Sequence, residues 1–342
     1  MSYEISLIIF SAINIFLIIF FKNFKILLDN PEHGGHKSKL NQGIPLTGGT
    51  YFLLSIFLII FNDQSSIVPN IYFIFFLLIF ILGAFSDSIK NMTPTLRLII
   101  QITIILSCIY LMDIKINKTS LTILDLFLSN FFFNLFFTTF CLLVLLNGSN
   151  FCDGVNANVV GYYLIVFFGL AYLTNDQTNL NNLILIILCL SIFYVSNLLN
   201  YSFLGDNGVY FISFFSGVYL INFINFESSL NPLIAINLLW YPAYENLFSI
   251  VRRMIKKIKV DHADTLHLHT LFKKYLSFKY KKINNLNSIS GFIFNLYNLI
   301  SISLSLYFID SSYILLLIII INLITYNFVY LVLKNLLKNK PL

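Results

Sequence analysis

The segment Asn147-Gly-Ser-Asn150-Phe-Cys-Asp153-Gly154-Val-Asn156 separates two strongly apolar runs, Phe131–Leu146 and Val159–Leu173. It holds three carboxamides, one carboxylate and two glycines. Each flanking run approaches the length of a helix that crosses a bilayer, so the sequence predicts two spans joined by a polar connection. Unpaired amides and carboxylates are costly at a membrane. The segment is therefore either a turn capped by its own side chains or part of a functional site.

The composition is that of an integral membrane protein. Of the 342 residues, 58% are hydrophobic and 11% are charged, whereas ordinary soluble chains carry about 25% charged residues. The four cysteines (Cys108, Cys141, Cys152 and Cys189) have no metal or disulfide spacing, which favours a packing role. The apolar run Ile5–Phe21 follows no basic region and precedes no small-residue cleavage site, so we expect a retained first span.

Eleven segments are apolar and long enough to be candidate spans, and together they predict an all-α, polytopic membrane bundle that forms a single domain over residues 1–342. They cover approximately 3–21, 48–62, 69–86, 95–112, 123–146, 157–174, 180–200, 208–225, 232–251, 289–309 and 312–333. The fifth segment is long enough to contain a kink near Ser129-Asn130.

The distribution of lysine and arginine predicts the orientation. If successive loops alternate between the two sides, one side receives 19 of the 21 basic residues, and only Lys115 and Lys118 fall on the other. Cytoplasmic loops are enriched in Lys and Arg. We therefore expect the N-terminus outside, the C-terminus in the cytoplasm, and the net charge of +6 at a membrane surface and not on a nucleic acid.

Five polar segments fall on the predicted cytoplasmic side, within residues 31–49, 86–97, 147–158, 200–208 and 252–288. In the first, Gly48-Gly49 begins a helix near Lys39, which suits either a phosphate or an ordinary Pro/Gly turn. In the second, Asp87 closes a span and is followed by Lys90, which suits either an anion site or an ion-paired turn.

The remaining segments offer further candidates. Asn150, Asp153 and Asn156 are spaced by three and would share one face if helical. Asp206 lies between glycines and is either a ligand for Mg²⁺ or a helix cap. His267 and His269 are separated by two positions, whereas a zinc helix uses a spacing of four, so phosphate binding is the better interpretation.

The placement of these polar groups disfavours a transporter. Transported solutes are generally bound near the bilayer midplane, often at broken helices, whereas the predicted span interiors are almost free of charge. Polar groups gathered on one face instead favour an enzyme that brings a soluble anionic substrate to a lipid headgroup.

The ordered set of motifs resembles the polyprenyl-phosphate N-acetylhexosamine-1-phosphate transferases, in glycosyltransferase family 4. These enzymes include the translocase of peptidoglycan synthesis and the initiators of O-antigen. The resemblance extends from about residue 30 to 275. It rests on Pro45…Gly48-Gly49, Ser86-Asp87, Asn147-x-x-Asn150-x-x-Asp153-Gly154, Phe203-Leu-Gly205-Asp206-Asn-Gly208 and Asp264-x-x-His267-Leu-His269.

The resemblance implies transfer of a sugar-1-phosphate from a UDP-N-acetylhexosamine-type donor to undecaprenyl or another polyprenyl phosphate, with release of UMP. It implies Mg²⁺ held by Asp206 and Asp87. Mn²⁺ in place of Mg²⁺ and a homodimer are both compatible with the resemblance. Asp87, Asp206 and Lys90 would be catalytic, and the substrate-binding residues would be Lys39, Asn147, Asn150, Asp153, Asn156, Asn200, His267 and His269. The setting would be the bacterial inner membrane, with the site facing the cytoplasm, and the pathway would be lipopolysaccharide-type envelope synthesis.

One position departs from the family pattern. The family has paired aspartates where this chain has Ser86-Asp87. A lipid monophosphate has a second pKa of about 6 and is mostly dianionic at neutral pH, so it can attack without a general base. The alternative is a non-catalytic family member or a flippase for lipid-linked sugars.

Overall fold

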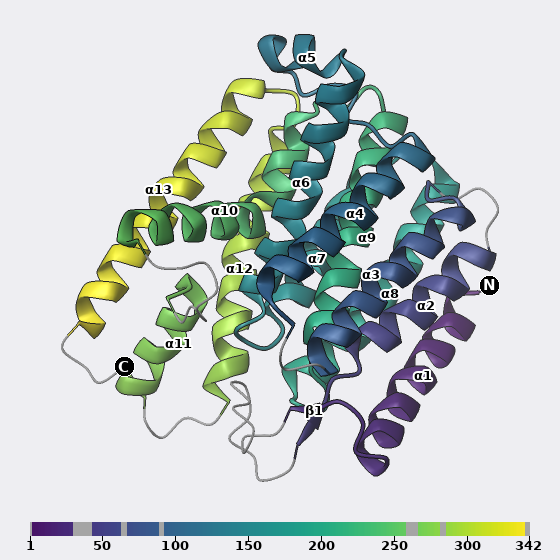
Figure 1. The fold of residues 1–342 in the computed structure, drawn as a ribbon, viewed down its shortest axis with the longest axis vertical. Helices are drawn as coiled ribbons and strands as arrows, with labels where there is room; N and C mark the ends of the chain where they lie inside the picture. Colours follow the sequence, from purple (N-terminus) through teal and green to yellow (C-terminus); the bar gives the residue numbers. More distant parts are fainter. Residues whose placement is uncertain are drawn as a thin grey trace.

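The computed structural model describes residues 2–29, 43–62, 67–88, 92–257, 266–280 and 285–338. Within these ranges the fold is almost entirely helical (Figure 1). The α-helices are α1 (Tyr3–Asn23), α2 (Gly48–Asn62), α3 (Phe73–Ser88), α4 (Pro94–Met112), α5 (Thr122–Leu128), α6 (Phe131–Cys152), α7 (Asn158–Leu173), α8 (Gln177–Leu198), α9 (Gly205–Phe226), α10 (Leu233–Lys256), α11 (Leu268–Lys279), α12 (Leu286–Tyr307) and α13 (Ser312–Leu337). A short 3-10 helix, η2 (Asn70–Tyr72), precedes α3, and β1 (Leu28–Asp29) pairs antiparallel with β2 (Ile44–Pro45).

The protein is a multi-pass membrane protein. Eight helices in the described ranges are long and apolar enough to cross a membrane: α1, η2 with α3, α4, α6, α8, α9, α12 and α13. The other expected spans correspond to α2 and α7, which are apolar but have only 15 and 16 residues, and to α10, which is long but more polar. The count of eleven spans and the orientation of the termini stay predictions.

The predicted kink in the fifth segment is a complete break. Helix α5 ends at Leu128, and α6 begins at Phe131. The side chain of Asn130 accepts a hydrogen bond from the N–H of Phe133 at 3.1 Å and so caps α6. The sequence therefore located the irregularity correctly, because Ser and Asn prefer a cap to a helix interior.

Helix α9 forms the centre of the bundle. It packs against α2, α3 and α6, and 72% of its most apolar stretch is buried. Every residue from Asn207 to Leu220 is buried, which is typical of a helix enclosed by other helices. Aromatic contacts join it to its neighbours, including Phe76 on α3 with Phe215 at 5.4 Å between ring centroids. The N-terminus of α9 is therefore held in a fixed position by the surrounding helices.

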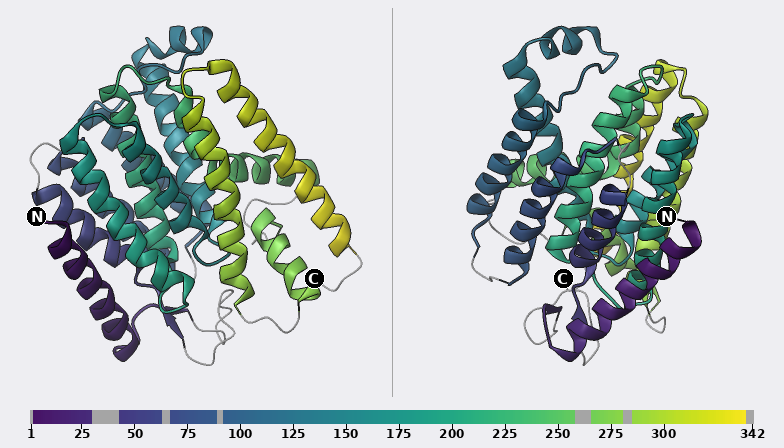
Figure 2. Two further views of the ribbon diagram at one scale, coloured as in Figure 1. Left: turned by 180° about the vertical axis from the view of Figure 1, so that it is seen from behind. Right: turned by 90° about the vertical axis from the view of Figure 1, so that its right-hand side faces the viewer.

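Contacts between loops define two opposite ends of the bundle. At one end, near α5, the Ser120 hydroxyl donates to Asn231, and Asn231 donates to Ser312. The β1–β2 pair lies at the other end, as Figures 1 and 2 show. All the polar segments described below lie toward that second end, which we call the site end.

Helix α10 differs from its neighbours in direction and character. The part labelled in Figure 1 runs across α13 and not along it. Pro242 lies inside the helix, where proline removes a backbone hydrogen bond and favours bending. The last turn carries Arg253 and Lys256, which complement the negative end of the helix dipole. The C-terminal half of α10 contacts α13 and the residues that lead into α11.

Candidate functional site

The centre of the candidate site is the contact between the end of α3 and the start of α9. The hydroxyl of Ser86 donates to Asp206 Oδ2 at 2.6 Å, and the Arg97 guanidinium lies 3.5 Å from the same oxygen. The Asp206 and Arg97 side chains are 28% and 25% exposed, so both remain reachable from outside the bundle. Gly83 permits the approach, because a Cβ there would lie 2.4 Å from Asn207 Cα.

Asp87 stabilises the first turn of α9. Its two carboxylate oxygens accept hydrogen bonds from the N–H groups of Asp206, at 2.9 Å, and Asn207, at 3.0 Å. A carboxylate at a helix N-terminus is favoured by the dipole and satisfies amides that have no partner inside the helix. Asp87 therefore acts as a cap supplied by another helix, and it holds the backbone that carries Asp206.

The double glycine at the start of α2 has a packing role that the phosphate interpretation did not anticipate. The Gly49 N–H donates to Asn207 Oδ1 and the Gly48 N–H to the Phe203 carbonyl, each at 3.3 Å. A Cβ on Gly48 would lie 2.8 Å from Leu204 Cα. These two amides serve contacts inside the protein, so the glycines bring α2 against α9 and do not offer a phosphate cradle.

The central polar segment is partly helical, in contrast to the expected loop. Helix α6 continues through Cys152, so Asn147 and Asn150 lie in its last turns and Asp153 is its C-terminal cap. Asn147 donates to Gln101 on α4 at 3.0 Å, and Asn150 approaches the Tyr210 hydroxyl of α9 at 3.5 Å. The helix ends before Asn156, so the condition under which Asn150, Asp153 and Asn156 would share one helical face is not met.

Asn156 and Asn200 belong to a partly buried network of carboxamides. Asn156 is 2% exposed. It donates to Asn200 Oδ1 at 2.5 Å and accepts from Asn287 at 2.7 Å. Asn200 adopts a left-handed backbone conformation with φ of 63°, which asparagine tolerates better than most residues. Both side chains thus help to join the start of α12 to the turn before α7 and to the residues that follow α8.

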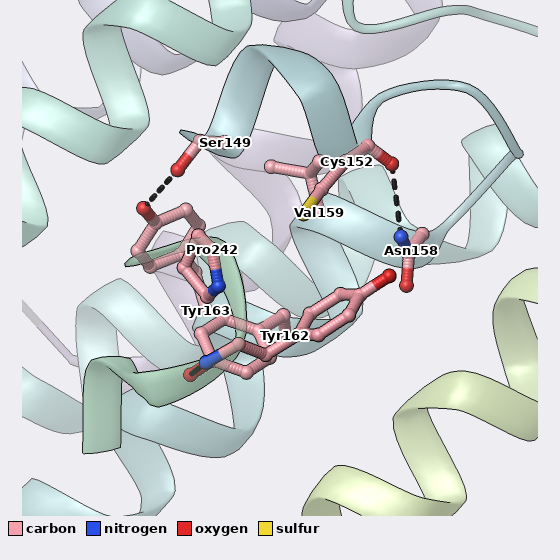
Figure 3. Close-up of a pocket in the computed structure, with 8 residues that line it drawn as sticks. Ser149, Cys152, Asn158, Val159, Tyr162, Tyr163 and Pro242 are labelled. Carbon is pink, nitrogen blue, oxygen red and sulfur yellow. Dashed lines mark hydrogen bonds between the residues drawn. The ribbon is translucent and has the colours of Figure 1, made fainter. Parts of the chain in front are cut away.

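A small internal cavity lies beneath this segment (Figure 3). Its volume is about 10 Å³, close to the minimum for one water molecule. Ser149 bonds to the Tyr163 hydroxyl at 2.6 Å, and Asn158 donates to the Cys152 carbonyl at 2.9 Å across the turn. The cavity is too small for a nucleotide or a sugar. We interpret it as part of the support beneath the α6–α7 connection.

The two histidines stack on each other and on the end of α6. The His267 and His269 rings are nearly parallel with centroids 5.7 Å apart, and Phe151 stacks on His267 at 5.1 Å. His269 is fully buried, approaches the Tyr241 hydroxyl at 3.4 Å, and packs directly beneath Gly154. His267 keeps 7% of its surface exposed, so it is the better placed of the two for a direct ligand contact.

One supporting residue, Glu245, was not predicted from the sequence. Glu245 on α10 is completely buried and lies 2.9 Å from His267 Nδ1. The sequence did contain a signal for Glu245, since it is the single charged residue within 232–251. An ionisable residue inside a predicted span indicates function by default.

Some predicted residues cannot be placed. Lys39 and Lys90 lie outside the described residues. Among the residues that are described, no group of three or more His, Cys, Asp or Glu side chains is arranged to hold a metal. Asp206 nevertheless suits Mg²⁺, because no described residue donates a hydrogen bond to its Oδ1 and the side chain is partly exposed. Mg²⁺ commonly binds one or two carboxylates together with substrate phosphates.

The fold and the site define a multi-pass membrane protein with a polar, carboxylate-containing site at one end of a helical bundle. Residues 70–224 match the family model described as glycosyl transferase family 4. This match supports the glycosyl transferase family 4 superfamily and a glycosyltransferase activity. No curated protein matches the chain significantly. The match includes Ser86, Asp87 and Asp206, whereas His267 and His269 lie beyond it.

Proposed function

We propose that this protein transfers an N-acetylated sugar-1-phosphate from a UDP-sugar to undecaprenyl phosphate in a Mg²⁺-dependent reaction that releases UMP. The family match suggests a membrane-bound glycosyl-1-phosphate transferase. The observation that carries the proposal is the junction of α3 and α9, where Asp206, Ser86 and Arg97 meet at a partly exposed position. The product would initiate an envelope polysaccharide of the O-antigen or lipopolysaccharide type, at the cytoplasmic face of the bacterial inner membrane.

The proposed metal site consists of Asp206 and the neighbouring Asp87. Asp206 would be the principal ligand, because both Asp87 oxygens already accept backbone N–H groups. When bound, Mg²⁺ would neutralise charge on the diphosphate of the donor and polarise it toward attack. The Arg97 guanidinium adds a fixed positive charge beside this position. Lys90 or Lys39 would neutralise the acceptor phosphate.

The proposed donor site lies at the end of α6. Asn150 and Asp153 are half-buried and would hold the nucleoside and sugar, whereas Asn156 and Asn200 support the adjoining turn. His267 would contact a phosphate, with His269 packed behind it. An acceptor phosphate oxygen would form a bond to the phosphorus that carries the sugar, and the bond to UMP would break. Fixed positioning and charge neutralisation account for the rate without a general base.

The test is a transfer assay in membranes. Membranes with the protein are incubated with undecaprenyl phosphate, Mg²⁺ and labelled UDP-sugars, including UDP-N-acetylglucosamine, its C4 epimer and 6-deoxy N-acetyl sugars. We expect labelled lipid and free UMP with at least one donor, and loss of both in Asp206→Asn. Asp113→Asn is the matched control, because this exposed aspartate pairs with Lys115 at the opposite end of the bundle.

The rival is a non-catalytic family member or a flippase of lipid-linked sugars. A flippase would move a preformed lipid-linked sugar between leaflets without releasing UMP. The proposal would be overturned if the wild-type protein formed no labelled lipid and no UMP with any donor of the panel while a control enzyme was active in parallel. A donor that gives equal product with wild type and Asp206→Asn would overturn the assignment of Asp206.

A further inference from the structure

We propose that Glu245 is a positioning residue for His267: it holds the Nδ1 side of the imidazole so that Nε2 faces the ligand. This inference rests on the proposed function, in which His267 contacts a phosphate. It assigns a role to a helix, α10, that lies outside the residues matched by the family model.

The geometry around His267 is asymmetric. Nδ1 lies 2.9 Å from Glu245 Oε1 and 3.4 Å from the Ser249 hydroxyl. No described residue forms a hydrogen bond with Nε2, although the rest of the ring is enclosed by the faces of Phe151 and His269. The ring is thus clamped on both faces and at one nitrogen, and the other nitrogen is left for a ligand.

Glu245 is itself held by a second helix. Its carboxylate is fully buried, and its Oε2 accepts a hydrogen bond from the Tyr326 hydroxyl of α13 at 2.7 Å. Burying a carboxylate is costly unless its oxygens are paired. Tyr326 and His267 together occupy both oxygens, which fixes the carboxylate in the orientation that meets Nδ1.

The hydrogen bond also fixes a proton on one nitrogen of the histidine. An ionised carboxylate can only accept, so His267 carries a proton on Nδ1 whether the ring is neutral or charged, and the charged ring is the form that can also donate from Nε2 to a phosphate oxygen. Without the carboxylate, the ring could exchange tautomers or rotate. For metal-binding histidines, loss of such an outer partner costs roughly 10–100-fold in affinity or activity, and we expect an effect on the same scale for His267.

A double-mutant cycle distinguishes positioning from a purely structural role. Glu245→Leu removes the acceptor at similar volume and is expected to lower kcat in the transfer assay by about 10–100-fold. Glu245→Gln keeps an acceptor oxygen, so its kcat should be at least about tenfold higher than that of Glu245→Leu. In a His267→Asn background, Glu245→Leu should cause little further loss, because the two residues act as one unit.

The matched control is Asn237→Leu, which removes another buried polar side chain from α10. Asn237 accepts a hydrogen bond from Ser305 and lies about two helical turns before Glu245 on α10. It should leave kcat close to the wild-type value. If Glu245→Leu fails to fold, Tyr326→Phe is the smaller change, because it removes only the hydroxyl that bonds to Glu245. Tyr326→Phe should lower kcat a few-fold only when His267 is present.

A readout independent of activity is the ¹⁵N NMR signature of the histidine side chains, of which the chain has five. The His267 signal should report a protonated Nδ1 in the wild type and a changed or mixed tautomer in Glu245→Leu. Full additivity in the cycle, or an unchanged His267 spectrum in Glu245→Leu, would overturn the inference. An inactive wild type with the expected spectral change would instead count against the proposed function alone.

Discussion

At the scale of single residues, Ser86 is the position where this chain departs from the family it resembles. Its hydroxyl donates to Asp206 at 2.6 Å, so a serine here orients the proposed metal ligand. Ser86→Ala removes a hydrogen bond to a charged group, worth roughly 1.5–3 kcal/mol. We therefore expect the transfer rate to fall about tenfold or more, measured as initial velocity at saturating substrates.

Ser88→Ala is the control for that prediction. Ser88 lies two residues further along α3, is exposed, and within the described residues its hydroxyl bonds only to the Ala84 carbonyl of its own helix. Its substitution should leave the rate unchanged. Equal rates for Ser86→Ala and wild type would show that Ser86 does not orient Asp206. A large gain in Ser86→Asp would mean that the serine is a defect and would weaken the argument against a general base.

At the scale of elements, the close contact of α3 and α9 decides whether the site forms. A methyl group at Gly83 would meet Asn207 backbone atoms at 2.4 to 2.7 Å, and backbone cannot move aside as a flexible side chain can. Gly83→Ala should therefore separate the two helices, cost about 1–3 kcal/mol of stability, and reduce activity through the Ser86–Asp206 contact. Thermal unfolding in detergent and the transfer assay measure both effects.

Gly169→Ala on α7 is the matched control for the helix contact. An added Cβ there meets only side-chain ends, the nearest being Leu238 Cδ2 at 3.2 Å. Alanine also favours a helix over glycine by about 1 kcal/mol. We expect little change or a small gain in melting temperature. If Gly83→Ala were equally harmless, the tight α3–α9 approach would not control the site.

The sequence predicted the elements better than their contacts. Hydrophobic run length identified the apolar helices and the break at Ser129-Asn130, because both depend on local composition. It did not predict that α6 continues to Cys152, since Asn and Asp at a helix end look the same in sequence as in a loop. Nor could it separate Asn150, at the site, from Asn156, buried among other amides, because that difference arises only from packing.

At the scale of the whole molecule, the site depends on segments far apart in the chain. Gly49 contacts Asn207, Ser86 contacts Asp206, Asn156 contacts Asn287, and Gly154 packs on His269. These contacts join the starts and ends of α2, α3, α6, α9, α11 and α12 at the site end. The order of motifs in the sequence predicted that these polar segments lie together, but the folded bundle is needed to show which residues contact one another.

The orientation of the bundle is the prediction that belongs to the whole molecule. If the eleven predicted spans alternate, 19 of the 21 basic residues fall on the side assigned to the site, so the positive-inside rule predicts a cytoplasmic site. Single cysteines at Lys118 and Lys279, both exposed and on opposite sides, can test this by labelling intact cells with a membrane-impermeant maleimide. We expect Lys118→Cys to be labelled from outside and Lys279→Cys only after the membrane is opened. Three native cysteines are buried and Cys141 is half-buried, so background should be low. The reverse pattern would place the site outside, where nucleotide sugars are scarce, and would contradict both the orientation and the proposed donor.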